Sequence, residues 1–410
     1  MRILQTRLKE TAPRIADSCT EKHITSNSDM KKKLALAFMA SAVVLLAPAQ
    51  NTGSKPQNPG VNSLPGQTLF EKSMKEGVSC YRIPAIVTAA NGDLVAAIDE
   101  RVLSCGDLKW NRDINIVVRR SHDNGKTWTG IETVVDFPLG QSASDPSMVV
   151  DKETGEIFLF YNYMDLDKEK DVYYFHVVSS RDNGKTWSQP RDITSSLSTD
   201  DMKPDFKFIT SGCGTCTSDG KLLHTIVNLK KGLYVFGSDD HGKTWYFIDH
   251  PLTPGDESKI IELPDGRWMV SSRVNKAGLR YAHVSDDQGH TWTTRPDSAL
   301  TDPGCNGSIL AYSSHRQGDD RDRVILSHLA DPKDRRNLVV RLSYDNGQTW
   351  PYSKAICAGS AAYSSLTVLD NGDIAIFYEK DDYQKNEFAV FTLDWLTDGQ
   401  DTFRKPTRRD

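Results

Sequence analysis

The sequence lacks the motifs that mark several common classes of enzyme. It contains no H-E-x-x-H metal motif, no phosphate-binding P-loop and no G-x-S-x-G nucleophile motif. One C-x-x-C pair, Cys213 and Cys216, stands without a second pair and without an alternating strand–helix pattern, which disfavours a zinc or redox site. The sequence therefore gives no support to metal, nucleotide or serine chemistry, and we expect no cofactor.

A hydrophobic run long enough to cross a bilayer is missing near the N-terminus. The apolar residues 34–46 are too few to span it. They follow the basic stretch MKKK and precede Ala-Pro-Ala at residues 47–49, which is typical of a cleavage site. This pattern predicts a signal peptide over residues 30–49 and export to the periplasm or the medium, with a retained anchor as the alternative. Residues 1–29 precede a better start codon at Met30, and we interpret them as a mis-called upstream extension.

A large excess of positive charge is missing as well. The chain has 50 Lys and Arg against 55 Asp and Glu, and removal of the first 49 residues leaves a net charge of −9. A net negative chain disfavours nucleic acid or an anionic membrane as a partner, so an anionic substrate would have to be held by local arginines. Six of the seven cysteines follow the leader, and an even number in an exported chain permits disulfides whose connectivity the spacing does not give.

Five copies of one eight-residue phrase run through the rest of the chain. They fit S-x-D-x-G-x-T-W, and their starts lie 59, 58, 47 and 58 residues apart. The copies occupy residues 121–128, 180–187, 238–245, 285–292 and 343–350. A period of this size indicates an array of supersecondary units, and its length is near that of a four-stranded blade of a β-propeller.

The chemistry of the phrase predicts a rigid turn. Its Asp accepts hydrogen bonds from nearby backbone N–H groups, its Gly supplies a positive φ, and its Trp buries a large ring. Catalysis or metal binding by these aspartates is the alternative, but five equivalent turns on a radial array cannot all reach one centre. We therefore expect the repeat to be scaffold.

A second set of turn signals falls between the copies. They are Asn91-Gly92, Thr154-Gly155, Asp219-Gly220, Asp265-Gly266, Asn371-Gly372 and a less regular turn at residues 316–322. Each precedes a short apolar run, which is typical of a hairpin followed by a strand.

Six hairpins and five repeats predict an all-β fold, a six-bladed β-propeller of four-stranded antiparallel sheets over residues 68–395. Pairing of residues 388–393 near residues 68–70 would close the ring and protect the sheet edges. Residues 50–67 are then a linker and residues 396–410 a C-terminal tail, with no room for a second globular domain.

Arginines stand where strands of different blades are expected to begin or end. Arg82 lies in the sequence Tyr-Arg-Ile-Pro that opens the first strand, and Arg273 ends the strand after the Asp265-Gly266 turn. Arg335 and Arg336 lie just before an apolar strand. Taken alone, each fits a surface cation. If three of them converge at the axis of the ring, they could bind one carboxylate through paired hydrogen bonds. A guanidinium group suits this geometry better than an ammonium group.

The five repeats, the Tyr-Arg-Ile-Pro opening and the motifs described next resemble the exo-α-sialidases (neuraminidases), in particular the secreted bacterial type. The resemblance covers residues 68–395. The repeat alone also occurs in other families, whereas its combination with Arg-Ile-Pro is more specific. The resemblance implies sialylated glycans, glycoproteins or glycolipids as substrates, and we expect a monomer.

The resemblance implies an arginine triad that clamps the carboxylate of sialic acid. Arg82 matches the first member, and Arg273, sixteen residues after Glu257, matches the second. Both Arg335 and Arg336 are available for the third, and the spacing to the downstream tyrosine motif favours Arg335.

The implied nucleophile is a tyrosine, matched by Tyr363 in the sequence GSAAYSSL. A free phenol has a pKa of about 10 and needs a partner that takes its proton, and Glu257 matches that partner. A neutral nucleophile avoids the repulsion that a carboxylate nucleophile would meet from the carboxylate of the substrate. Such sialidases are an exception to the rule of two catalytic carboxylates.

The implied general acid and base is an aspartate on a mobile loop a few residues past an arginine. Asp107 matches it, with Asp113 in reserve, and a solvated loop aspartate is the alternative interpretation. Arg101 and Asp145 match positions that contact the 4-hydroxyl of the sugar.

The function implied is retaining hydrolysis through a tyrosyl-enzyme intermediate. Two alternatives remain: a trans-sialidase, which passes sialic acid to galactose, and a non-catalytic glycan-binding propeller. The second alternative predicts loss of one of Arg82, Glu257 and Tyr363, and all three are in place.

Overall fold

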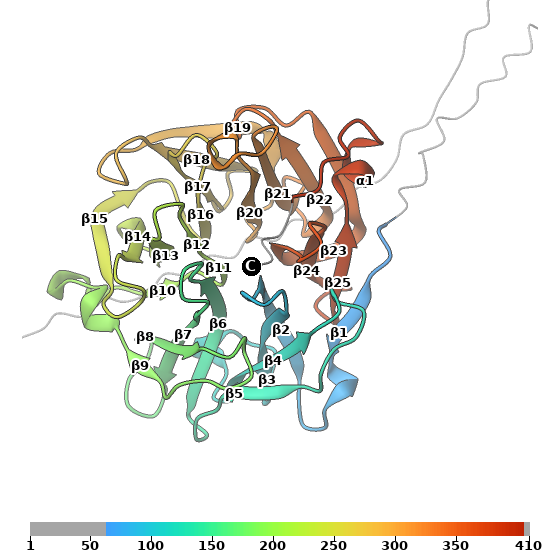
Figure 1. Ribbon diagram of the computed structural model, residues 1–410. Helices are drawn as coiled ribbons and strands as arrows, with labels where there is room; N and C mark the ends of the chain where they lie inside the picture. Colours follow the sequence, from blue (N-terminus) through green and yellow to red (C-terminus); the bar gives the residue numbers. More distant parts are fainter. Residues whose placement is uncertain (1–62, 406–410) are drawn as a thin grey trace, which may run out of the picture. The chain divides into compact units, whose positions relative to one another are not determined.

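The computed structural model describes residues 63–405 of the chain (Figure 1). The predicted upstream extension and signal peptide, residues 50–62 of the predicted linker and the last five residues of the predicted tail lie outside this range. Within it, no helix combines the length and the apolar character that a membrane span requires.

The regular secondary structure of the described chain is almost entirely β-strand, arranged as sheets around a common centre (Figure 1). Two sheets have four strands: β2 (Cys80–Thr88), β3 (Leu94–Arg101), β4 (Ile114–Ser121) and β5 (Glu132–Val135); and β16 (Ser258–Glu262), β17 (Trp268–Ser272), β18 (Leu279–Ser285) and β19 (Thr293–Thr301). The all-β propeller architecture expected from the sequence is confirmed.

Two further sheets have five strands. The first contains β6 (Gln141–Val150), β7 (Ile157–Asp165), β8 (Tyr174–Ser180), β9 (Arg191–Asp192) and β11 (Gly212–Cys213), which joins β6 in parallel. The second contains β10 (Lys207–Ile209), β12 (Thr215–Cys216), β13 (Leu222–Asn228), β14 (Gly232–Ser238) and β15 (Tyr246–Leu252).

The last sheet has seven strands. It contains β1 (Gln67–Glu71), β20 (Ser308–Ser313), β21 (Arg323–Leu329), β22 (Arg336–Ser343), β23 (Tyr352–Val368), β24 (Ile374–Lys380) and β25 (Lys385–Phe391). The described helices are short: η1 (Lys72–Met74), η2 (Leu108–Trp110), η3 (Thr194–Ser196), η4 (Asp200–Met202), η5 (His315–Gln317) and α1 (Leu393–Thr397).

The prediction of six separate four-stranded sheets was wrong in its number, since the described residues form five sheets. The reason is β23, which runs for 17 residues without a break. Its first part, as far as Ser360, pairs with β22, and the part from Ala361 onward pairs with β24. One strand thus joins two groups of strands that the turn signals had predicted to be separate.

The strand pairing expected at ring closure is present. β1 pairs with β25, and Gln67 lies opposite Phe388. The first and last strands of the described chain therefore lie in one sheet, and the edges that they turn toward each other are hydrogen-bonded.

Each copy of the repeat forms the turn between the third and fourth strands of a four-strand group, as between β8 and β9. In the second copy, Asp182 accepts hydrogen bonds from the Thr186 N–H at 2.8 Å and the Thr186 hydroxyl at 2.6 Å. Ser180 donates to Asp182 at 2.9 Å and accepts from the Gly184 N–H at 2.8 Å. The other four copies repeat these contacts within 0.2 Å.

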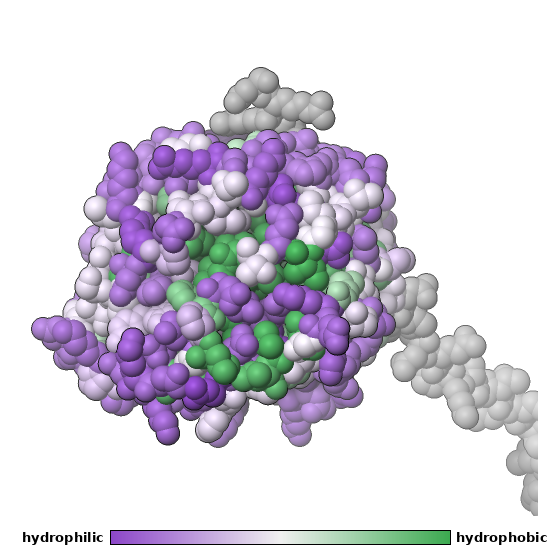
Figure 2. All heavy atoms as spheres, turned by 90° about the horizontal axis from the view of Figure 1, so that it is seen from below, coloured by the Kyte–Doolittle hydropathy of each residue, from purple (hydrophilic) through white to green (hydrophobic). Residues whose placement is uncertain are grey.

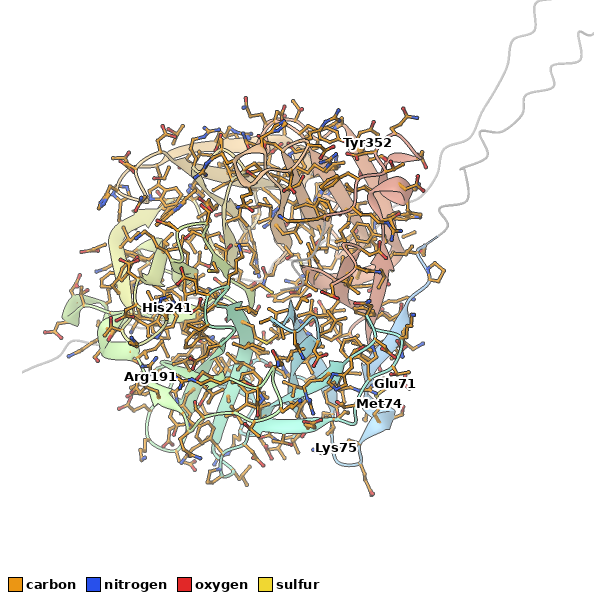
Figure 3. The ribbon with its side chains drawn as sticks, viewed as in Figure 1. Glu71, Met74, Lys75, Arg191, His241 and Tyr352 are labelled. Carbon is orange, nitrogen blue, oxygen red and sulfur yellow. A yellow bond between two sulfur atoms is a disulfide. The ribbon has the colours of Figure 1, made fainter. Side chains whose placement is uncertain are left out.

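Side chains of a neighbouring sheet also form hydrogen bonds to these turns. Arg191 of β9 donates to the carbonyls of Gly242 at 2.6 Å and Lys243 at 2.9 Å, both in the third copy. Figure 3 labels Arg191 and, from that copy, His241. His241 of that copy lies 2.8 Å from Asp151. The expected role of the repeat as scaffold therefore includes locking one sheet to the next.

The core lies between adjacent sheets. One cluster packs Val95 and Ala97 of β3 against Leu159 and Tyr161 of β7, all with no exposed surface. Seen from the side, the surface is mostly hydrophilic, with apolar residues gathered near the middle of that face (Figure 2).

Candidate active site

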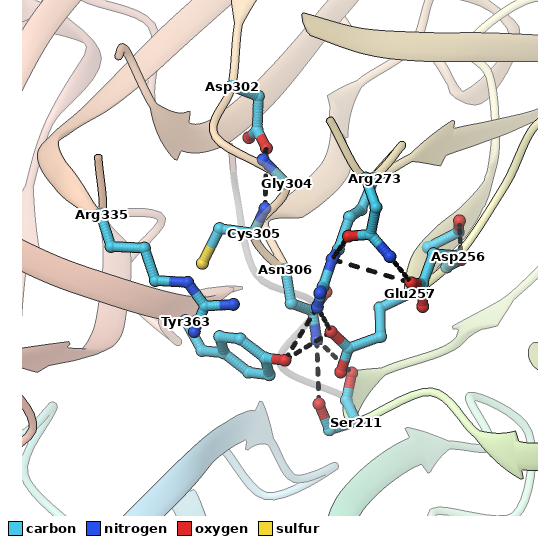
Figure 4. A network of polar contacts seen from close by, with 12 residues as sticks. Ser211, Asp256, Glu257, Arg273, Asp302, Gly304, Cys305, Asn306, Arg335 and Tyr363 are labelled. Carbon is cyan, nitrogen blue, oxygen red and sulfur yellow. Dashed lines mark hydrogen bonds and ion pairs between the residues drawn. The ribbon is translucent and has the colours of Figure 1, made fainter. Parts of the chain in front are cut away.

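Five of the residues predicted from the sequence come together near the centre of the ring, each within a strand or next to the end of one. Arg82 lies on β2 and Tyr363 on β23, while the other three adjoin strand ends. Glu257 precedes β16, Arg273 follows β17 and Arg335 precedes β22. Figure 4 shows four of the five side by side.

Tyr363, Glu257 and Arg273 form one hydrogen-bonded group. The Tyr363 hydroxyl donates to Glu257 Oε2 at 2.5 Å, and Arg273 Nη1 donates to the Tyr363 oxygen at 3.0 Å (Figure 4). Arg273 also forms an ion pair with Glu257. Burial and then the charge of Glu257 raise the pKa of Tyr363 well above its ordinary value, against the opposing charges of Arg273 and Arg335. The phenol is therefore protonated, with its hydrogen directed to a carboxylate.

The two other guanidinium groups flank the ring of Tyr363. The guanidinium carbon of Arg82 lies 5.9 Å from the centre of this ring and that of Arg335 lies 5.4 Å from it. Arg336 is exposed and pairs instead with Asp331 at 2.7 Å. The structure thus brings Arg335 to the site and leaves Arg336 outside it.

Tyr383 connects the same two arginines. Its ring centre lies 3.9 Å from the Arg82 guanidinium carbon, and its hydroxyl accepts from Arg335 Nη1 at 3.2 Å. Arg335 and Tyr383 also line a hollow of about 300 Å³ that opens beside Ala362. The sequence analysis did not single out Tyr383.

Glu379 of β24 is a second residue that the sequence analysis missed. It is fully buried and accepts from Arg82 Nε at 2.6 Å, from the Ile83 N–H at 2.9 Å and from the Tyr363 N–H at 3.1 Å. Burial alone would raise the pKa of Glu379, but the charge and hydrogen bond of Arg82, together with the N–H groups of Ile83 and Tyr363, outweigh burial and lower the pKa. A charged residue inside the apolar run IAIFYEK was the available signal, since a buried charge needs a partner.

Two strained backbone positions lie on the innermost strands. Ile83 has φ 68° and Asp145 has φ 61°, and each precedes a proline at a shift in strand register. Such conformations cost about 1–3 kcal/mol each in non-glycine residues and persist where the surroundings fix them. Here a buried carboxylate accepts each N–H: Glu379 that of Ile83 and Asp99 that of Asp145, both at 2.9 Å.

Arg101 connects Asp107 to the interior. Its Nη1 donates to Asp107 Oδ1 at 2.8 Å, and its Nη2 donates to the buried Asp99 at 3.0 Å. The Asp107 side chain is 75% exposed, whereas that of Arg101 is buried. Partial desolvation would raise the pKa of Asp107, but the charge and hydrogen bond of Arg101, helped by Arg82 and Arg335, lower it below its ordinary value.

Asp145 and Asp113 have different surroundings. Asp145 accepts from Asn162 Nδ2 at 3.1 Å, and burial followed by the charges of Asp99 and Glu257 raises its pKa well above the ordinary value. The charges near Asp113 are different ones. Burial raises the pKa of Asp113, and the carboxylates of Asp136 and Glu100 raise it further. The structure therefore places Asp107 and Asp145 with the arginines and does not place Asp113 there.

Asp99 was also missed by the sequence analysis. Burial raises its pKa to about 6, against Arg101, Ser144 and the Asp145 N–H, which all lower it. No group of three His, Cys, Asp or Glu side chains among residues 63–405 is arranged to hold a metal ion.

Comparison with known proteins gives consistent matches. Residues 92–376 match the BNR repeat-like domain. The sialidase of Micromonospora viridifaciens is 35% identical over 396 residues, covering 88% of this chain and 59% of the relative. The sialidase of Bacteroides fragilis is 28% identical over 335 residues, covering 73% and 60%. The chain thus spans about three fifths of the length of these relatives.

A solved structure supports the same assignment. A Hadza microbial sialidase superimposes with a TM-score of 0.73 at 25% identity, covering 81% of this chain and 69% of the other. The chain belongs to the family of proteins with a BNR repeat-like domain, and within it to the sialidases.

Proposed function

We propose that the protein is an exo-α-sialidase, a glycoside hydrolase that releases terminal α-linked sialic acids from glycans, glycoproteins or glycolipids with retention of configuration. The observation that carries this proposal is the hydrogen bond from Tyr363 to Glu257, made between the guanidinium groups of Arg82, Arg273 and Arg335.

The arginines account for substrate binding. Three guanidinium groups around one phenol create a positive site that fits a carboxylate next to the anomeric carbon. Arg273 and Arg82 are each held by a buried carboxylate, so their positions are set before the substrate arrives.

Tyr363 supplies the nucleophile. Its raised pKa makes a free phenolate too costly, so the proton must leave as the bond to the anomeric carbon forms. Glu257, 2.5 Å away, is placed to accept it. A neutral nucleophile also avoids repulsion from the substrate carboxylate.

Asp107 supplies the proton for the leaving oxygen and then acts as the base that activates water. In the free protein Arg101, Arg82 and Arg335 lower the pKa of Asp107. A substrate carboxylate bound to Arg82 and Arg335 offsets part of this positive charge, so binding raises the pKa of Asp107 toward the range that proton donation needs.

The test is to incubate the purified protein with a fluorogenic aryl α-sialoside between about pH 4 and pH 8 and to follow the first-formed anomer by NMR. We expect release of the α-anomer of sialic acid. No release at any pH in this range contradicts the enzyme proposal, and a first-formed β-anomer contradicts retention.

The same reaction separates hydrolysis from transfer. Mass spectrometry of the products in the presence of excess galactoside shows free sialic acid for a hydrolase and a new sialoside for a trans-sialidase. An anhydro product would indicate intramolecular transfer.

Export is part of the proposal, on the basis of the predicted signal peptide over residues 30–49. A disulfide between Cys80 and Cys105 supports an oxidising compartment. Mass spectrometry of the mature N-terminus and size-exclusion chromatography test cleavage after Ala49 and the monomeric state.

A further inference from the structure

A disulfide bridge connects the strand of Arg82 to the loop of Asp107. Cys80 is the first residue of β2, two positions before Arg82, and Cys105 lies two positions before Asp107. The bridge joins two cysteines 25 positions apart, and the segment between them contains the β2–β3 hairpin. We propose that this bridge positions Asp107 for proton transfer, an inference that rests on the proposed function.

Apolar packing holds the loop between β3 and β4 only weakly. Leu108 is buried in a small cluster with Met164 and Tyr173. Leu103 and Trp110 of the same loop are 56% and 72% exposed. A loop with so little buried apolar surface needs other tethers to keep one conformation.

One polar tether of the loop depends on the charge of Asp107, whereas others, such as those from Ser142 to the Asn111 carbonyl and from Gly140 to the Arg112 carbonyl, do not. Arg101 Nη1 donates to the Cys105 carbonyl at 2.9 Å and to the Asp107 carboxylate at 2.8 Å. Asp107 must be protonated to act as the acid, and protonation removes the ionic part of its bond to Arg101. The contact to Arg101 is therefore weakest in the state that donates the proton.

The bridge is independent of that charge. It fixes the backbone two residues before Asp107 whether the carboxyl group is ionised or protonated. Cys80 also lies opposite Arg101 in the strand register, so the bridge and the guanidinium hold the loop from the same end of the hairpin. The covalent link thus keeps Asp107 near the arginines when the ionic link is lost.

The bridge is open to chemical test. Cys80 is buried, but Cys105 is exposed, so a thiol in solution can reach its sulfur. Reduction with dithiothreitol transfers two electrons and two protons to the bridge, giving two thiols, while the reagent closes to its cyclic disulfide.

The experiment compares two leaving groups in the reduced protein and in the Cys80→Ser/Cys105→Ser variant. An activated phenol departs without a proton, whereas a galactoside alcohol needs the acid. We expect kcat/KM for the galactoside to fall about tenfold and that for the aryl sialoside to stay within about twofold. Cys216→Ser, which removes a buried free thiol, serves as the matched control and should change neither.

A double-mutant cycle shows whether the bridge acts through Asp107. Asp107→Asn should give the same preference for the aryl substrate with a larger loss. Adding the two serine substitutions to Asp107→Asn should then change the galactoside rate less than about twofold. Equal losses on both substrates, or full additivity with Asp107→Asn, would overturn the inference and leave the bridge a role in stability alone.

Hydrogen exchange gives a reading that does not require activity. The backbone N–H groups of Val102 and Trp110 donate to the backbone carbonyls of Asp113 and Asp107. These amides should exchange at least about tenfold faster without the bridge. Unchanged exchange overturns the inference. If the intact protein cleaves neither substrate, the proposed function fails, and the exchange rates still decide whether the bridge holds the loop.

Discussion

The repeat turns and the candidate active site are both dense networks of hydrogen bonds to carboxylates, but they differ in how far along the chain their partners lie. In the second repeat, Asp182 binds Thr186, four residues away. In the site, Glu257 binds Tyr363 across 106 residues and Glu379 binds Arg82 across 297. Each turn can form from its own segment, whereas the site forms only when the ring is complete.

This difference divides the expected effects of substitution. A change in a turn should lower stability and leave the chemistry of the site untouched. A change at the centre should affect the chemistry, and where a buried charge loses its partner it should affect stability as well. Four experiments test this division.

The largest effect is expected from Tyr363→Phe. It removes the proposed nucleophile and keeps the ring, so kcat should fall by at least about 10²-fold while the melting temperature changes little. Tyr344→Phe is the matched control, since it removes a hydroxyl bonded to Asp401 in another part of the ring. A variant with wild-type kcat would show that Tyr363 is not the nucleophile.

Glu379→Gln should affect both properties. It leaves Arg82 buried without its ion pair, which costs about 3–5 kcal/mol of unfolding free energy, and it loosens Arg82 and Tyr363 together. We expect a large loss of kcat/KM as well. The measurements are urea unfolding and steady-state kinetics.

Glu132→Gln is the control for that experiment. It breaks a half-buried Arg–Glu pair, between Arg120 and the more exposed Glu132 at 3.0 Å, and should cost less than Glu379→Gln, with no change in rate. Similar losses for the two variants would mean that burial does not set the cost.

Asp182→Ala should lower stability and leave the rate unchanged. It removes the acceptor for the Thr186 N–H and hydroxyl in an exposed turn, for which we expect a loss of about 1 kcal/mol. Urea unfolding and kcat on the aryl sialoside are the measurements. A fall in kcat without a fall in stability would contradict the assignment of the repeat as scaffold.

The smallest effect is the dependence of stability on acid pH. Hydrogen bonds from Thr186 lower the pKa of Asp182 to about 2, below the value of about 3.9 for an unfolded chain. The unfolded state therefore binds the proton first, so this contribution is present above about pH 4 and is lost as the pH falls toward 2. The slope of unfolding free energy against pH over this interval should be smaller in Asp182→Asn. An unchanged slope would show that Asp182 does not contribute.

Residues that the motifs contain could be found from the sequence. The repeat predicted its own turns because the hydrogen bonds that close each turn fall within the eight residues of the phrase. Arg82, Glu257, Arg273 and Tyr363 were found through their motifs, and the structure brings them together. The choice of Arg335 over Arg336 depended on spacing, and the structure gives it a physical basis, since Arg336 pairs with Asp331.

The supporting residues could not be found in the same way. Glu379 and Asp99 look like ordinary residues of a strand. Asp99 binds Arg101 on its own strand, but the partners that tie the two carboxylates to the site lie on other strands, 297 and 46 residues away. The pairing of Cys80 with Cys105 was likewise left open by the spacing. The continuous β23 was missed because turn signals mark where a chain reverses, and no signal marks where a strand passes straight from one group of strands into the next.

The long-range pair of Arg82 and Glu379 has a consequence for synthesis of the protein. Arg82 leaves the ribosome 297 residues before the carboxylate that neutralises it, and the closing partner of β1 follows later still, in β25. Until then the nascent chain holds an unpaired cation in a strand destined for burial. The geometry that cleaves a glycan therefore appears only at the end of translation, and a chain released early carries finished turns but no working centre.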